Sequence, residues 1–135
     1  MKVKVLVCGC HSRKLVPENI DLGVLTAELD DDLDIEYAMM HPLLCGSGGN
    51  SAMRDLFRAS THDTYFVLAG CEPATQAVYF GDVISESGFP RHRIIPVDIR
   101  GMNTEQAAAA VLRAVSEVTA KEESLSVPHG DGFSG

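Results

Sequence analysis

The chain has 135 residues, of which 45% are hydrophobic and 22% are charged, as expected for one folded domain rather than a disordered segment. Its formal net charge of -8 argues against binding to nucleic acid or to an anionic membrane surface, and it suits a partner protein with a basic docking face. The apolar run at the start is too short for a signal peptide, and no run approaches membrane-spanning length, so we expect a cytoplasmic protein without membrane insertion.

Strand-like and helix-like segments alternate along the chain. Strands are expected at residues 2–8, 35–40, 64–69 and 93–99, where β-branched and aliphatic residues predominate. The helices between and after them are expected to begin at Asn19 or Asp21, at Asn50 or Ser51, at Pro73 and at Asn103 or Thr104; the third should end at Gly88, and the acidic run 28–34 after the first should be a solvated loop.

This alternation predicts an α/β fold, namely a flavodoxin/Rossmann-like three-layer sandwich with a mainly parallel, four-stranded sheet. The expected strand order is 2-1-3-4. Residues 1–121 would form the domain. From about Glu122 the composition shifts to Ser, Gly and Pro, so residues 122–135 are expected to be a flexible tail or linker.

Four cysteines follow the predicted strands. Cys8 and Cys10 end the first strand, Cys45 follows the second, and Cys71 follows the third. In a sheet of order 2-1-3-4 these three strands are neighbours, and their carboxyl ends lie along the edge where α/β sheets bind ligands. Four thiolates together suit an iron–sulfur cluster, with [4Fe–4S] as the first choice and [2Fe–2S] as the second.

Small and basic residues beside the cysteines suit an anionic cluster. Glycines allow backbone N–H groups to approach sulfur, helices beginning near Asn50 and Pro73 would direct their positive ends at the site, and Arg13 and Lys14 would add positive charge. These glycines are Gly9, Gly46, Gly48, Gly49 and Gly70. The nearby histidines, His11 and His41, are interpreted as polar loop residues rather than ligands.

Other interpretations of the cysteines remain open. A buried cysteine is often a small hydrophobe, so the chain could be a metal-free protein-interaction module. Four thiolates also bind zinc, although structural zinc sites favour C-x-x-C pairs that this chain lacks. A thiol redox enzyme using Cys8 and Cys10 would need a strained small-ring disulfide. The C-x5-R motif of cysteine-based phosphatases is absent.

The three cysteine segments resemble the N-terminal iron–sulfur domain of the HdrA-like family of heterodisulfide reductase proteins. In that family a first strand ends in C-x-C, a C-[SG]-x-x-G loop follows the second, and the third ends in A-x-C-x-P. The matching segments here are Val7-Cys8-Gly9-Cys10, Cys45-Gly46-Ser47-Gly48-Gly49 and Ala69-Gly70-Cys71-Glu72-Pro73. Residues 97–100 are similar to the family's Asn-Ile-Arg segment, with Asp98 in place of Asn. The resemblance covers roughly residues 3–115. More distantly, the chain is similar to the delta subunit of methyl-viologen-reducing hydrogenase.

The resemblance implies that Cys8, Cys10, Cys45 and Cys71 are the ligands of one cluster. It also implies an electron relay within an oxidoreductase complex, with flavin-containing or other iron–sulfur subunits as partners and no catalytic residues in this chain. The family's larger members continue into an FAD-binding domain, so we expect any flavin chemistry to lie outside these residues.

Overall fold

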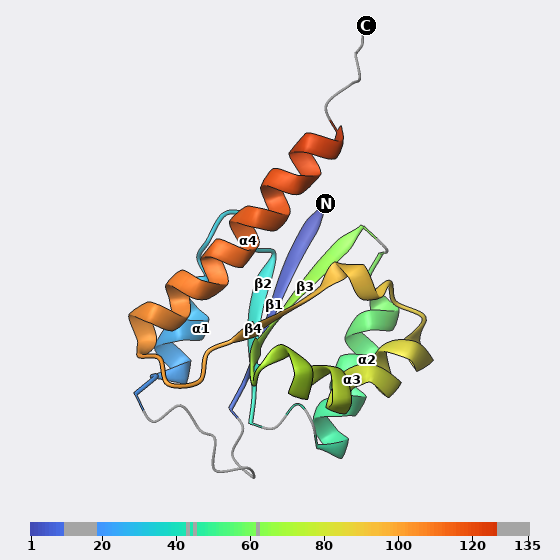
Figure 1. Ribbon diagram of the computed structural model, residues 1–135, viewed down its shortest axis with the longest axis horizontal. Coiled ribbons are helices and arrows are strands. Elements are labelled where there is room, and N and C mark those ends of the chain that lie inside the picture. The colour runs from blue at the N-terminus through green and yellow to red at the C-terminus, as the bar shows by residue number, and fades with distance from the viewer. Residues whose placement is uncertain (10–18, 43, 45, 62, 127–135) are drawn as a thin grey trace, which may run out of the picture.

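The computed structural model describes residues 1–9, 19–42, 44, 46–61 and 63–126 (Figure 1). Within them, strands and helices alternate as the sequence predicts. In chain order the elements are β1 (Lys2–Cys8), α1 (Leu22–Asp30), β2 (Tyr37–His41), α2 (Ser47–Ala59), β3 (Thr64–Gly70), α3 (Pro73–Ser87), the 3-10 turn η2 (Arg91–Arg93), β4 (Ile94–Asp98) and α4 (Thr104–Ser126).

The four strands form one parallel sheet in the order β2-β1-β3-β4, which confirms the predicted fold class and strand order. The central strand β3 is buried along its whole length. Its continuous apolar run is typical of parallel strands that are covered on both faces. Because β1, β2 and β3 are neighbouring parallel strands, their carboxyl ends meet at one edge of the sheet.

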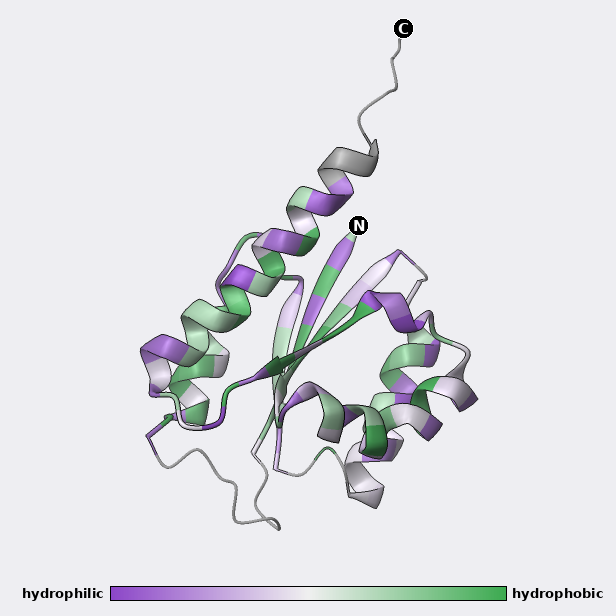
Figure 2. Ribbon diagram, in the orientation of Figure 1, coloured by the Kyte–Doolittle hydropathy of each residue, from purple (hydrophilic) through white to green (hydrophobic). Residues whose placement is uncertain are grey.

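Helices cover both faces of the sheet (Figure 1). Side chains alternate across a strand, so Val3, Val5 and Val7 pack with the apolar sides of α1 and α4, whereas Leu6 and Cys8 pack with those of α2 and α3. Figure 2 shows hydrophobic residues along the strands and hydrophilic ones along every helix, as expected for helices that bury one side. Cys8 thus belongs to the core layer under α2 and α3.

Local sequence signals account for most of the helix ends. Asp21 caps α1, with its carboxylate accepting from Val24 N at 3.0 Å, as predicted. Gly88 ends α3 in the left-handed conformation at φ 72°, which glycine adopts without steric cost. Asn103 and Gln106 cap α4 reciprocally, each side chain accepting from the other residue's backbone N–H.

Two predicted helix boundaries are wrong. α2 begins at Ser47 with Gly46 as its N-cap, not at Asn50 or Ser51, because the glycines there adopt helical geometry despite their low propensity. α4 continues to Ser126, past the predicted start of the tail at Glu122. The Tyr65 hydroxyl donates to Glu122 Oε2 at 3.1 Å and ties that turn of the helix to β3. Residues 127–135 lie outside the described part of the chain.

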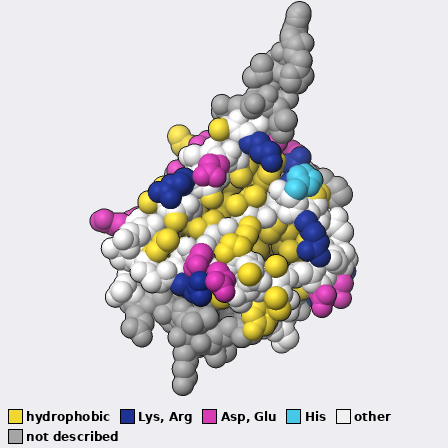
Figure 3. All heavy atoms as spheres, in the orientation of Figure 1, with side chains coloured by type: hydrophobic (Ala, Val, Ile, Leu, Met, Phe, Trp, Pro, Cys, Tyr) yellow, Lys and Arg dark blue, Asp and Glu magenta, His cyan; other side chains and the backbone are white. Residues whose placement is uncertain are grey.

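The strand β4 forms one edge of the sheet, and all five of its residues are partly exposed. The backbone N–H of Ile99 points toward β3, where it donates to Gly70 O at 3.1 Å. Because backbone N–H groups alternate sides along a strand, the backbone nitrogen at position 96 points away from β3. The residue there is Pro96, which has no N–H to offer a further strand. Figure 3 shows hydrophobic side chains gathered on this face around a hollow, with charged side chains around them.

None of the described helices has the length and apolar character needed to cross a membrane.

Candidate functional site

Two of the four cysteines meet at the carboxyl edge of the sheet. Cys8 is the last residue of β1 and is 5% exposed, while Cys71 directly follows β3 and is partly exposed. Both line one small pocket, together with Leu44, Gly70 and Gln76 among others. The predicted juxtaposition of the first and third cysteine segments is therefore present.

The pocket between these thiols is small and largely apolar. Its volume of about 10 Å³ is the space of roughly one water molecule. Leu68, Tyr79 and Phe80 contribute to its walls. The pocket therefore forms an apolar wall beside the two described thiols.

The segment that carries Cys45 is joined to Cys8 by a hydrogen bond. The backbone N–H of Leu44, the residue just before Cys45, donates to Cys8 Sγ at 3.3 Å in a buried position. Gly9 N donates to His41 O at 2.8 Å, so the ends of β1 and β2 stay paired as the chain leaves the sheet. Backbone donors of this kind are what an anionic sulfur requires when it is buried.

Glycine is needed at one site position in particular. A Cβ at Gly70 would lie 3.2 Å from the Cβ of Cys8, closer than most such contacts, so glycine lets the two strands bring the thiol segments together. At Gly48 nothing lies within 4 Å of an added Cβ, so no close approach explains that glycine among the described atoms. Gly48 and Gly49 are instead in the first turn of α2.

Two helices begin immediately after cysteines. The corrected start of α2 places its N-cap, Gly46, directly after Cys45, and no side chain caps it; the Gly46 carbonyl accepts from Asn50 N at 2.8 Å. α3 begins with Glu72 as N-cap and Pro73 at the first helical position, directly after Cys71. The first turn of a helix carries free N–H groups and partial positive charge, which stabilise nearby anions.

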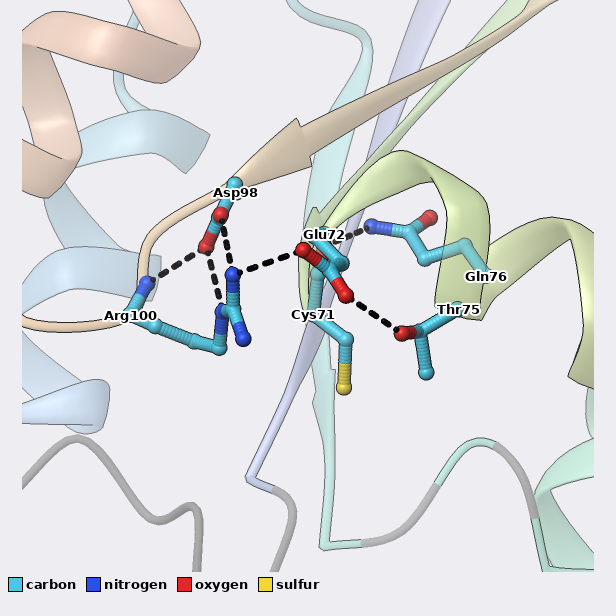
Figure 4. A network of polar contacts seen from close by, with 6 residues as sticks. All are labelled: Cys71, Glu72, Thr75, Gln76, Asp98 and Arg100. Carbon is cyan, nitrogen blue, oxygen red and sulfur yellow. Dashed lines mark hydrogen bonds and ion pairs between the residues drawn. The ribbon is translucent and has the colours of Figure 1, made fainter.

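Gln76 holds the chain around Cys71 from within the core. Its amide Nε2 donates to Cys71 O at 2.8 Å (Figure 4). The same nitrogen donates to Leu68 O at 3.1 Å. Because both partners are acceptors, the amide nitrogen must face them. Oε1 then has no partner among the described residues, although Gln76 is only 5% exposed. A buried, unpaired acceptor costs free energy, so the contacts made by Nε2 must outweigh that cost.

A network of charged residues holds the same loop from the solvent side (Figure 4). Arg100 contacts Asp98 through Nε at 3.0 Å and Nη2 at 2.8 Å, and its Nη2 lies 3.2 Å from Glu72 Oε2. Glu72 also accepts from Thr75 Oγ1 at 3.2 Å. The hydrogen bonds from Arg100 lower the pKa of Asp98 despite its partial burial, and Asp98 in turn raises the pKa of Arg100.

The remaining predicted ligands and basic residues belong to segments outside the described part of the chain. Cys10, Arg13, Lys14 and His11 lie outside the described residues, as does Cys45. Among the residues that the structure does describe, no group of three or more His, Cys, Asp or Glu side chains could hold a metal ion. The described part of the predicted set therefore consists of two thiols and the glycines around them.

The sequence reasoning missed the residues that fix Cys71. Gln76 and Thr75 look like ordinary positions near a helix start, and Arg100 lies far along the chain from Glu72. The segment 97–100 stands out in the sequence only for its similarity to a family motif. No sequence pattern specifies the pairing of Arg100 with Asp98 and Glu72, which depends on β3 and β4 being neighbours.

A scan of the chain against protein-family models finds no match, and a search of curated proteins finds none either.

Proposed function

We propose that this chain carries one iron–sulfur cluster on Cys8, Cys10, Cys45 and Cys71 and relays electrons within an oxidoreductase complex. The observation that carries the proposal is the meeting of Cys8 and Cys71 at one sheet edge, with Cys8 Sγ accepting from the backbone N–H of the residue next to Cys45. A cluster bound by four thiolates takes up and releases single electrons.

The described residues have the properties that such a site needs. Leu44 N donates to one sulfur, Gly70 permits the close approach of the two strands, and the N-termini of α2 and α3 follow two of the cysteines. Gln76 and Arg100 fix the backbone and the charges beside Cys71.

The resemblance to the HdrA-like family of heterodisulfide reductase proteins supports the same proposal and extends it. On that basis the partners are flavin-containing or other iron–sulfur subunits, and [4Fe–4S] is preferred to [2Fe–2S]. Four thiols in a ligand set also suit the reducing cytoplasm better than an oxidising compartment.

Anaerobic reconstitution with iron and sulfide tests the proposal. We expect roughly four iron and four sulfide per chain for [4Fe–4S], or about two of each for [2Fe–2S], and an EPR signal after reduction by dithionite. Replacing any one of the four cysteines by Ser should lower the iron content, whereas His41→Ala, at the same sheet edge, should not. Failure to assemble a cluster with all four cysteines intact would refute the proposal. Bound zinc with no iron would favour a zinc-binding interaction module instead.

A further inference from the structure

The exposed edge of the sheet carries a groove that the proposed electron relay does not explain. It lies between α3 and β4, has a volume of about 130 Å³, and faces the viewer in the hollow region of Figure 3. Its lining is apolar except for an amide and a guanidinium: Leu68, Pro73, Gln76, Ala77, Phe80, Ile84, Arg91, Ile94 and Pro96. The groove is slightly smaller than the cavity of about 150 Å³ that binds benzene, so it is close in size to a single large apolar side chain.

A single cation lies among the described residues that line the groove. Arg91 is its only charged lining residue, and Nη2 of Arg91 donates to two neutral acceptors, Gly81 O at 3.2 Å and Ser85 Oγ at 2.6 Å. Among the described residues Arg91 forms no ion pair.

The open edge does not favour a partner that adds a strand. Pro96 occupies the outward-facing position and lacks the N–H that strand addition would use. The groove instead accepts side chains, and its apolar lining with a single cation selects an apolar residue next to carboxylates.

We infer that the α3–β4 groove is a docking site for a partner protein that inserts a Leu or Phe side chain flanked by Asp or Glu. The apolar side chain would pack between Phe80, Ile84 and Ile94, and a flanking carboxylate would pair with Arg91. The groove shares Leu68, Gln76 and Phe80 with the pocket beside Cys8 and Cys71, so a protein docked here would lie one layer of side chains from those thiols.

The test uses the metal-free full chain, so its result is independent of whether a cluster forms. The probe is the peptide acetyl-Glu-Glu-Leu-Phe-Glu-Glu-amide, added to ¹⁵N-labelled protein and followed by NMR. We expect shifts confined to residues of α3, η2 and β4. Affinity should fall as salt is raised, and it should be about tenfold lower for the peptide with Lys in place of every Glu.

Two neighbouring variants distinguish binding in the groove from nonspecific binding to the protein surface. Ala77→Glu places a carboxylate at the groove and should abolish the shifts. Val78→Glu places the same charge on the next residue of α3, which is 78% exposed and does not line the groove, and should leave binding unchanged. Both positions are exposed, so both variants should fold, as circular dichroism would verify.

Three outcomes would overturn the inference: no shifts at the groove, equal binding of the Glu and Lys peptides, or equal effects of the two variants. Concentration-dependent self-association that protects the groove in the free protein would also overturn it, because the occupant would then be a second copy of the chain.

Discussion

Gln76 offers the sharpest test of how the loop around Cys71 is held. Its Nε2 donates to two backbone carbonyls, and its Oε1 is buried with no partner in the part of the chain that the structure describes. Gln76→Met keeps the length of the side chain and removes both ends of the amide. Losing the donor to Cys71 O and to Leu68 O costs about 1–3 kcal/mol for each carbonyl, and removing the buried Oε1 recovers a similar amount once. We therefore expect the free energy of unfolding to fall by about 1–3 kcal/mol.

Gln76→Glu keeps Oε1 and replaces the donor Nε2 by a second acceptor oxygen. A carboxylate at this position would face two carbonyl oxygens, and an uncompensated buried charge costs about 3–5 kcal/mol. At neutral pH we expect this variant to unfold about 10 °C below Gln76→Met, given about 3 °C per kcal/mol for a chain of this size.

The effect of Gln76→Glu should depend on pH. Burial beside two acceptors raises the folded-state pKa of the new carboxyl above its unfolded value, so the folded state holds the proton more tightly. The protonated acid can also donate to Cys71 O. The deficit relative to Gln76→Met should therefore be small near pH 4 and grow as pH rises through the unfolded and then the folded pKa.

Urea unfolding followed by circular dichroism, at about pH 4.5 and about pH 7.5, measures both variants against the wild type. Equal stabilities of Gln76→Glu and Gln76→Met at the higher pH would refute the assignment of Nε2 as the donor to Cys71 O. A pH-independent deficit would show that the carboxylate reaches solvent and that the site is not buried as described.

Other substitutions probe the glycines, the surface charges and the sheet edge. Gly70→Ala should lower the free energy of unfolding by about 1 kcal/mol or more because its Cβ is crowded, whereas Gly48→Ala, in the open first turn of α2, should raise it by about 0.5–1 kcal/mol; urea midpoints compare the two. Arg100→Gln should lower the urea midpoint at neutral pH. The pKa of Asp98 is lowered in the folded state, so the ion pair stabilises the fold at pH values above the unfolded-state pKa and loses this effect as pH falls through the folded-state pKa. The loss of stability in Arg100→Gln should therefore shrink in acid, and a loss that does not change with pH would contradict the ion pair. Pro96→Val restores an outward N–H, so light scattering should detect more self-association than for the wild type, and an unchanged mass would contradict the protective role of proline.

The sheet was predictable because its signals are local and repeated. The buried β3, Thr64–Gly70, is one uninterrupted apolar run, and strands that alternate with helical segments leave few parallel topologies to consider. The Asp21 cap and the Gly88 terminus are single-residue signals with well-defined backbone causes.

The helix boundaries failed where tertiary packing overrides propensity. The three glycines in 46–49 disfavour a helix locally, and Asn50 and Ser51 are better caps, yet α2 starts at Ser47. Met53 and Phe57 anchor the helix in the core, so the turn before them forms as an extension of a stable segment. At the end of α4, polar composition suggested a tail, but no local signal stops the helix at Glu122.

The candidate site was predictable in its location but not in its supporting contacts. The position of Cys8 beside the segment of Cys71 follows from strand order alone. Gln76 and Arg100 contribute through distances between atoms on different elements, and a lone Gln or Arg in a sequence gives no indication of such partners.

Negative charge near the two described thiols is offset in two different ways. On the side of Cys8, the donors belong to the backbone: Leu44 N contacts Sγ, and the free N-terminus of α2 starts two residues later. Beside Cys71 an acidic residue, Glu72, begins α3, and Arg100 offsets its charge while Asp98 orients the guanidinium. Backbone donors cannot be removed by a side-chain substitution, whereas the Arg100 contacts can.

If the proposed cluster is present, Arg100→Gln should therefore make its reduction potential more negative without releasing iron, because uncompensated carboxylates disfavour the added electron. Loss of iron in that variant would instead indicate that the network holds Cys71 in place rather than adjusting the charge around it.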